Sequence, residues 1–141
     1  MRKIQFIAWY FLAVLPLDSA MAQSLQDYRC TIRRVASAEP PPNNSHDFHQ
    51  KNYINREFTV ERRTGVMAGT LKNAYVTSPQ VIDLGSKDNS FKVVTTMRKE
   101  EGIGAGSNVY VLTINEYVTS SKKPFIFVDN DIAYFGTCTH F

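Results

Sequence analysis

Alternation of apolar and polar residues is the main pattern in this chain after residue 27. Phe58 and Val60 alternate with polar neighbours, and the segment 91–98 alternates in the same way. Successive side chains of a β-strand point to opposite faces, so a period of two predicts strands with one buried face. The predicted strands are 28–36, 57–62, 66–71, 74–84, 91–98, 109–118, 124–128 and 132–137.

Turn-forming residues separate these predicted strands. The segment 63–65 ends in Gly65 and predicts a tight hairpin turn with that glycine in a left-handed conformation. The segments 85–89 and 129–131 predict two further turns. Pro79 interrupts the strand predicted for 74–84 and indicates an edge position or a bend, because proline cannot donate a backbone hydrogen bond.

Seven or eight short strands predict an all-β fold, either a single antiparallel β-barrel or a sandwich. The chain has almost no helical periodicity. Two segments, Glu39–Arg56 and Gly102–Ser107, are expected to be exposed loops. The first opens with three consecutive prolines, and the second contains three glycines, so neither suits a central strand.

The first 22 residues predict a cleaved signal peptide. A basic start at Arg2 and Lys3 precedes an apolar run over 4–17, and Ala20 and Ala22 form a small-residue cleavage pattern. The alternative is a retained membrane anchor, but spanning a bilayer takes about 20 residues. The chain is therefore predicted to comprise a signal peptide, 1–22, and one all-β domain, 23–141. We expect export to a periplasm or extracellular space, without stable membrane insertion after cleavage.

Composition narrows the class of protein without identifying a function. Hydrophobic residues make up 43% of the chain and charged residues 21%, which is typical of a globular domain and not of a disordered chain, a coiled coil or a multi-span membrane protein. Cleavage of 22 of the 141 residues leaves 119. It removes two basic residues and one acidic residue, and lowers the net charge from +3 to +2. This balance argues against nucleic-acid binding, which needs a clustered basic face.

Both cysteines, Cys30 and Cys138, remain after the predicted cleavage. An even pair in an exported protein predicts one disulfide. This bond would join the first predicted strand to the last, an arrangement that favours a closed or nearly closed barrel. The alternative is a thiol that acts as a nucleophile or metal ligand, which His140, two residues after Cys138, would suit.

Three further features could carry chemistry. His46 and His49 form a weak metal-binding candidate, because zinc accepts imidazole ligands but needs three or four, and only His140 remains to add one. A polar loop is the favoured interpretation, and no cofactor is predicted. The glycines of Gly102–Ser107 could approach a phosphate, but a strand and not a helix is predicted to follow, so a flexible hairpin loop is favoured. The carboxylates that could serve glycoside hydrolysis show no distinguishable pair; they are Glu57, Glu61, Glu100, Glu101 and Glu116.

The sequence therefore predicts a small exported β-domain that acts as a non-catalytic binding or accessory protein. Its partner is expected to be either a small apolar ligand, held inside a barrel, or another exported protein. As an inhibitor or subunit, it would dock through Glu39–Arg56 or Gly102–Ser107, because loops on rigid scaffolds often carry function. The remaining alternative is a small periplasmic hydrolase without a recognisable motif.

Overall fold

The fold was analysed in a computed structural model, which describes residues 25–40, 42, 44–102 and 106–141. The signal peptide predicted for 1–22 lies outside these residues. The described chain contains eight strands and one short helix, α1 (Asn44–Tyr53). The strands are β1 (Tyr28–Ser37), β2 (Glu57–Val60), β3 (Met67–Gly69), β4 (Gln80–Leu84), β5 (Phe91–Met97), β6 (Asn108–Ile114), β7 (Lys123–Asp129) and β8 (Ile132–His140).

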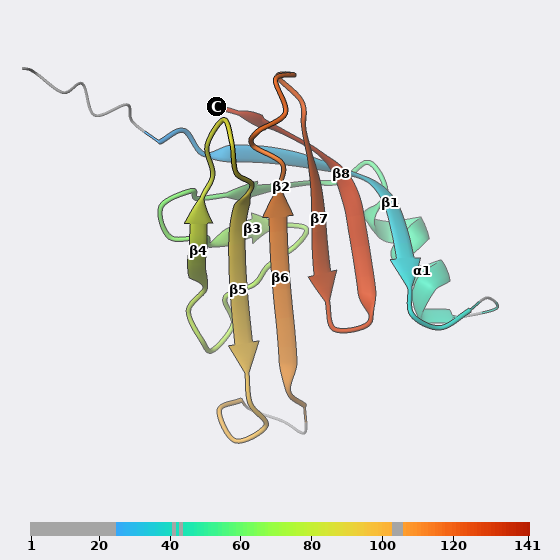
Figure 1. Cartoon of the computed structure of the whole chain (residues 1–141). Coiled ribbons are helices and arrows are strands. Elements are labelled where there is room, and N and C mark those ends of the chain that lie inside the picture. Colours follow the sequence, from blue (N-terminus) through green and yellow to red (C-terminus); the bar gives the residue numbers. More distant parts are fainter. Residues whose placement is uncertain (1–24, 41, 43, 103–105) are drawn as a thin grey trace, which may run out of the picture.

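All eight strands belong to one antiparallel sheet, which confirms the predicted all-β class. Their order is β3-β2-β1-β8-β7-β6-β5-β4, so the first and last strands are neighbours in its middle (Figure 1). The edges are β3 and β4, which are not paired with each other. The sheet is therefore a curled half-barrel that stays open, whereas its tied ends favoured a closed or nearly closed barrel.

The predicted disulfide between Cys30 and Cys138 is present. The two cysteines face each other directly in the β1–β8 register, and both are buried. The bond therefore reinforces a pair of strands that are also hydrogen-bonded over most of their length.

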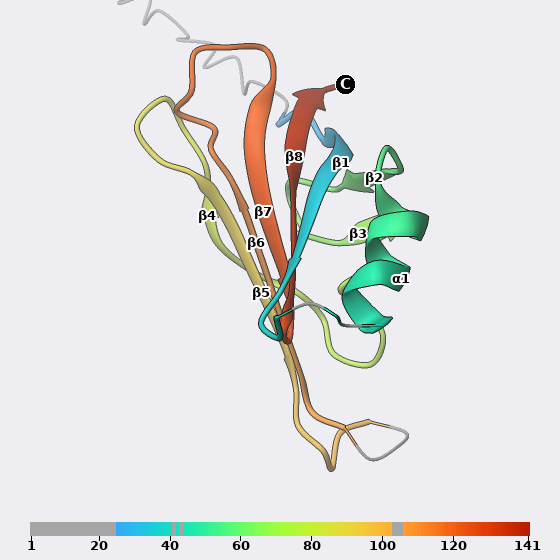
Figure 2. The same cartoon turned by 90° about the vertical axis from the view of Figure 1, so that its right-hand side faces the viewer.

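The core lies on the inner face of the curl. Figure 2 shows β2, β3 and α1 on one side of the long strands, so the inner face is covered and the outer face is open. Aromatic and aliphatic side chains fill this inner space. The largest of those less than 2% exposed are Tyr28, Tyr134, Phe58, Phe91, Phe127, Ile32, Leu112 and Ile114.

The helix corrects the prediction of an exposed loop over Glu39–Arg56. Residues 44–53 of that segment are helical, with Asp47 in the first turn and Lys51 in the last, charges that complement the helix dipole. Asn55 follows with a positive φ of 62°, a conformation common just after a helix end. The segment lacks the apolar periodicity by which helices are detected in a sequence. In agreement with this, no residue of α1 is buried.

Several predicted boundaries also change. The strand expected over 74–84 begins only at Gln80, and the one expected over 109–118 ends at Ile114. Residues 115–122 form a loop. Lys123 Nζ, at the start of β7, donates hydrogen bonds to the carbonyl oxygens of Glu116 and Val118 in this loop. Apolar residues alone do not extend a strand where no neighbouring strand is present to pair with it.

Other local predictions are confirmed. Gly65 has a φ of +75°, and a Cβ there would lie 2.7 Å from a methyl group of Val93, so both conformation and space require glycine. The strand that follows Pro79 is the edge strand β4. Within the described part of the chain, no helix is long and apolar enough to cross a membrane.

Candidate functional site

A cluster of polar side chains closes the end of the half-barrel that carries the C-terminus. At its centre is Glu116, from the β6–β7 loop, whose side chain is only 12% exposed. Its Oε2 accepts a hydrogen bond from the Tyr28 hydroxyl at 3.1 Å, and its Oε1 lies 2.9 Å from His140 Nε2. Arg62 Nη1 lies 3.9 Å from the same Oε1. Three strand ends thus converge on one carboxylate.

Arg62 is held rigidly in this cluster. Its Nε donates to the carbonyl oxygen of Leu84 at 2.8 Å, and its Nη2 donates to that of Gly85 at 3.0 Å. Its backbone N–H donates to Asp27 Oδ1 at 2.9 Å. The alternation along β2 continues past its end, so Arg62 points inward and is buried whereas Arg63 is exposed.

Burial also affects Tyr28, the hydrogen-bond donor of the cluster. Burial raises the pKa of its hydroxyl, the Arg62 guanidinium lowers it, and the negative Glu116 raises it. The result is well above the usual value for tyrosine, because burial penalises the phenolate. Tyr28 is therefore a neutral donor at physiological pH.

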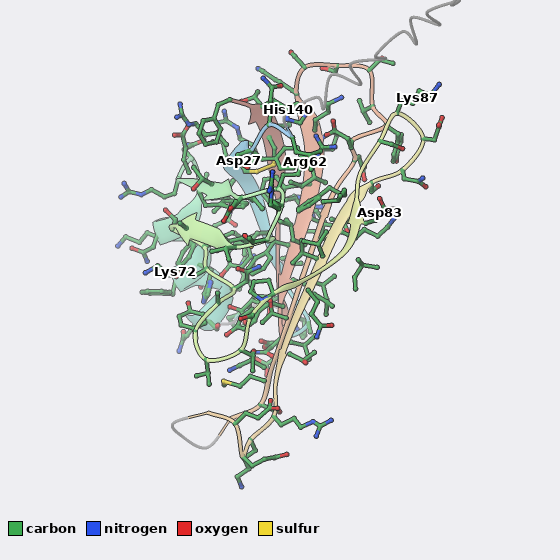
Figure 3. All side chains as sticks on the ribbon, turned by 90° about the vertical axis from the view of Figure 1, so that its left-hand side faces the viewer. Asp27, Arg62, Lys72, Asp83, Lys87 and His140 are labelled. Carbon is green, nitrogen blue, oxygen red and sulfur yellow. A yellow bond between two sulfur atoms is a disulfide. The ribbon has the colours of Figure 1, made fainter. Side chains whose placement is uncertain are left out.

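Above this cluster lies a depression with a volume of about 680 Å³. It is lined by Leu25, Gln26, Arg62, Gly85, Ser86, Lys87, Glu116 and His140. Figure 3 shows Asp27, Arg62 and His140 gathered at this end, with Lys87 at the tip of the β4–β5 turn and Lys72 away from them. Pockets of roughly 300–1,000 Å³ are typical of small-molecule sites.

The His140–Glu116 pair resembles the base and orienting group of a hydrolase, but its surroundings favour a structural pairing. Nε2 of His140 is occupied by Glu116, and its Nδ1 is buried without a hydrogen-bond partner among the described residues. A general base needs a nitrogen within reach of the proton it takes. Ser86, the hydroxyl residue of the depression, accepts a bond from the Asp88 backbone N–H. His140 and Glu116 therefore form a hydrogen-bonded pair at the base of the depression.

The two histidines predicted as a weak metal pair have different contacts. His46 Nδ1 lies 3.4 Å from the carboxylate of the adjacent Asp47. His49 Nδ1 is hydrogen-bonded to the Tyr134 hydroxyl, and its ring stacks on Tyr53 with centroids 5.0 Å apart. Across the described ranges, no group of three His, Cys, Asp or Glu side chains could hold a metal ion.

The structure thus joins two residues that sequence reasoning had placed in separate hypotheses. Glu116 was one of several unpaired carboxylates and His140 a spare metal ligand, and they now form a hydrogen-bonded pair. Arg62 was missed as a functional candidate. Its only signal was its position two residues after Val60 in an alternating strand, which predicts an inward-facing side chain. Of the loop Gly102–Ser107, the described residues 102, 106 and 107 do not line this depression, and 103–105 lie outside the described residues.

The fold and site define an all-β half-barrel with a polar depression at its disulfide-bonded end. No protein-family model, no curated protein and no solved structure matches the chain.

Proposed function

We propose that this chain is an exported, non-catalytic binding protein that holds a small anionic molecule in the depression above Arg62. The observation that carries the proposal is the convergence of separate strand ends and turns on one depression of about 680 Å³ with a rigid, buried guanidinium at its base. Preorganised polar groups of this kind fix the orientation of a bound ligand without a further loss of side-chain conformational entropy on binding.

The charges at the depression favour an anion. Its lining contains two permanent cations, Arg62 and Lys87, and a single carboxylate, Glu116. That carboxylate accepts from Tyr28, contacts His140 and lies 3.9 Å from Arg62, so the two cations and one carboxylate leave the lining with a net positive charge. A guanidinium has five N–H donors, and the two carbonyl bonds of Arg62 leave others for a ligand. A carboxylate or phosphate group is the chemistry that such a cation recognises best.

Export is supported by two features that point the same way. The disulfide between Cys30 and Cys138 belongs to a class of bond that persists mainly in oxidising compartments. The signal-peptide pattern over 1–22 agrees with this. The packed inner face of the curl supports an end site over carriage of an apolar ligand inside the barrel, because buried side chains such as Phe58 and Phe127 occupy that space.

The proposal can be tested by NMR titration of ¹⁵N-labelled protein with succinate and inorganic phosphate at constant ionic strength. We expect saturable shifts of the Gly85, Ser86 and His140 amides, and no shifts with the uncharged succinamide. Lys87→Gln should weaken binding several-fold. Lys72→Gln is the matched control, because Lys72 is also an exposed lysine but lies away from the depression. Equal binding by the two variants, or no saturation with either anion, would refute the proposal.

A further inference from the structure

A second group of polar and aromatic side chains lies at the opposite end of the half-barrel, next to α1 and the β7–β8 turn. Its centre is Asp129, the last residue of β7. Phe125 and Phe127 precede it at intervals of two on the buried face, so Asp129 continues the inward-facing row. In the sheet it is flanked by Tyr110 on β6 and Ile132 on β8. A carboxylate therefore occupies the end of an otherwise apolar row.

A row of aromatic rings runs through the strands and loops beside this carboxylate. The ring of Tyr110 is parallel to that of Phe127, with centroids 6.2 Å apart, and Tyr75 from the 70–79 loop lies 5.9 Å from Tyr110. On the other side, Tyr134 lies 6.0 Å from Phe127 and 5.5 Å from Tyr53 of α1. The rings form a continuous row from the 70–79 loop to the helix.

Asp129 has little compensation for its negative charge. Among the described residues its side chain accepts one hydrogen bond, from Asn130 Nδ2 at 3.2 Å. Burial raises the pKa of its carboxyl, the nearby His49 lowers it, and the neighbouring Asp131 raises it again, with a net increase. The negative charge of Asp129 in turn raises the pKa values of Tyr75, Tyr110 and Tyr134, each of which is raised first by burial.

The cluster can be reached from solvent. Tyr75 is 65% exposed, and Phe48 of α1 and Val76 are also largely exposed at this end. Asp129 itself is half-buried. Of the tyrosines in this row, Tyr75 is exposed, whereas Tyr110 and Tyr134 are buried.

The geometry points to a binding site for an organic cation at Asp129, in which an ammonium or guanidinium group pairs with the carboxylate and lies against the exposed ring of Tyr75. Ring faces attract cations, and the attraction grows when the cation is taken out of water. A small hydrated metal ion would not benefit from these rings in the same way. The site lies at the other end of the molecule from the Arg62 depression and does not depend on it.

The test is a titration with Nα-acetyl-lysine methylamide and with tetramethylammonium, followed by NMR shifts of the Tyr75, Tyr110 and Asp129 amides. Saturable shifts at these positions are expected, and their absence at tens of millimolar ligand would overturn the inference. Asp129→Asn should weaken binding at least tenfold. Asp131→Asn is the matched control, because it removes an exposed carboxylate two residues away in the same turn. Equal loss in both variants would show a non-specific charge effect and overturn the proposal.

Weaker binding by Asp129→Asn would not be caused by unfolding of the variant. Because the pKa of this carboxyl is raised in the folded state, its neutral form is favoured there, and the amide should unfold at the same temperature or higher. A second arm compares the free amines with a short lysine-rich peptide and an acidic peptide of equal length. Tighter binding of the basic peptide assigns the cation to a protein partner, and equal binding assigns it to a free amine. Binding of the acidic peptide would contradict the inference.

Discussion

Removal of the Cys30–Cys138 disulfide is the perturbation whose effect follows most directly from the topology. The bond joins strands near the two ends of the described chain, with a sequence separation of 108. In the folded protein β1 and β8 are also paired from Tyr28 to Ser37. The folded state therefore keeps this strand pair without the bond. Most of the lost stability arises because the unfolded state gains conformational freedom.

The size of the effect can be estimated from the closed loop. In the chain-entropy model, a loop of about 100 residues corresponds to about 4–5 kcal/mol of stability at 25 °C. A domain of this size has roughly 5–15 kcal/mol in total, so the loss is a large fraction of its stability. With the entropy of unfolding expected for the chain, the melting temperature should fall by on the order of 15 °C.

The assay is urea unfolding followed by far-ultraviolet circular dichroism, on the oxidised protein and on protein reduced in denaturant and refolded with reductant. A Cys30→Ala/Cys138→Ala variant provides an independent check, with a small additional loss from the two buried sulfur atoms. The reduced protein and the variant should agree within about 1 kcal/mol, each well below the oxidised protein. A difference between oxidised and reduced protein of less than about 1 kcal/mol, with an unchanged dependence on urea, would refute the reasoning.

Three further predictions concern the core and the Arg62 cluster. Arg62→Met should lower the free energy of unfolding by about 3 kcal/mol, because it leaves two backbone carbonyls and a half-buried carboxylate without their partner. Urea unfolding measures this change. Arg63→Met, at the exposed neighbour, should change the free energy of unfolding by less than about 0.5 kcal/mol in the same assay. Gly136→Ala should cost about 1–3 kcal/mol or more, measured by thermal unfolding, since a Cβ there would lie 2.0 Å from a backbone oxygen of β1. The raised pKa values of Tyr28 and Tyr134 mean that stability is intact below the ordinary tyrosine pKa, about 10, and falls as pH rises above it. Tyr134→Phe should reduce the slope of that fall in a pH series of melting temperatures, and an unchanged slope would contradict the assignment.

The local structure of this protein is determined largely by its sequence. Alternation with period two marks one face of each strand for burial, as at Phe58 and Val60, and this pattern survives in the sheet because strand side chains always alternate. Gly65 marks a hairpin turn and Pro79 marks an edge strand. Both are readable from the sequence because their backbone restrictions act within a few residues. The disulfide was also predictable, because two cysteines allow only one pairing within the chain.

Which distant elements meet depends on the long-range packing of the sheet. The order of the strands places the first beside the last and leaves β3 and β4 as open edges, and this depends on competing long-range pairings that alternation does not distinguish. The helix over 44–53 is set by its ends and by contact with β1, not by an apolar face of its own. The meeting of Glu116 with His140, and of Tyr110 with Tyr75, follows from this same arrangement. Single residues carry the chemistry, but their distances in space come from the packing of the whole sheet.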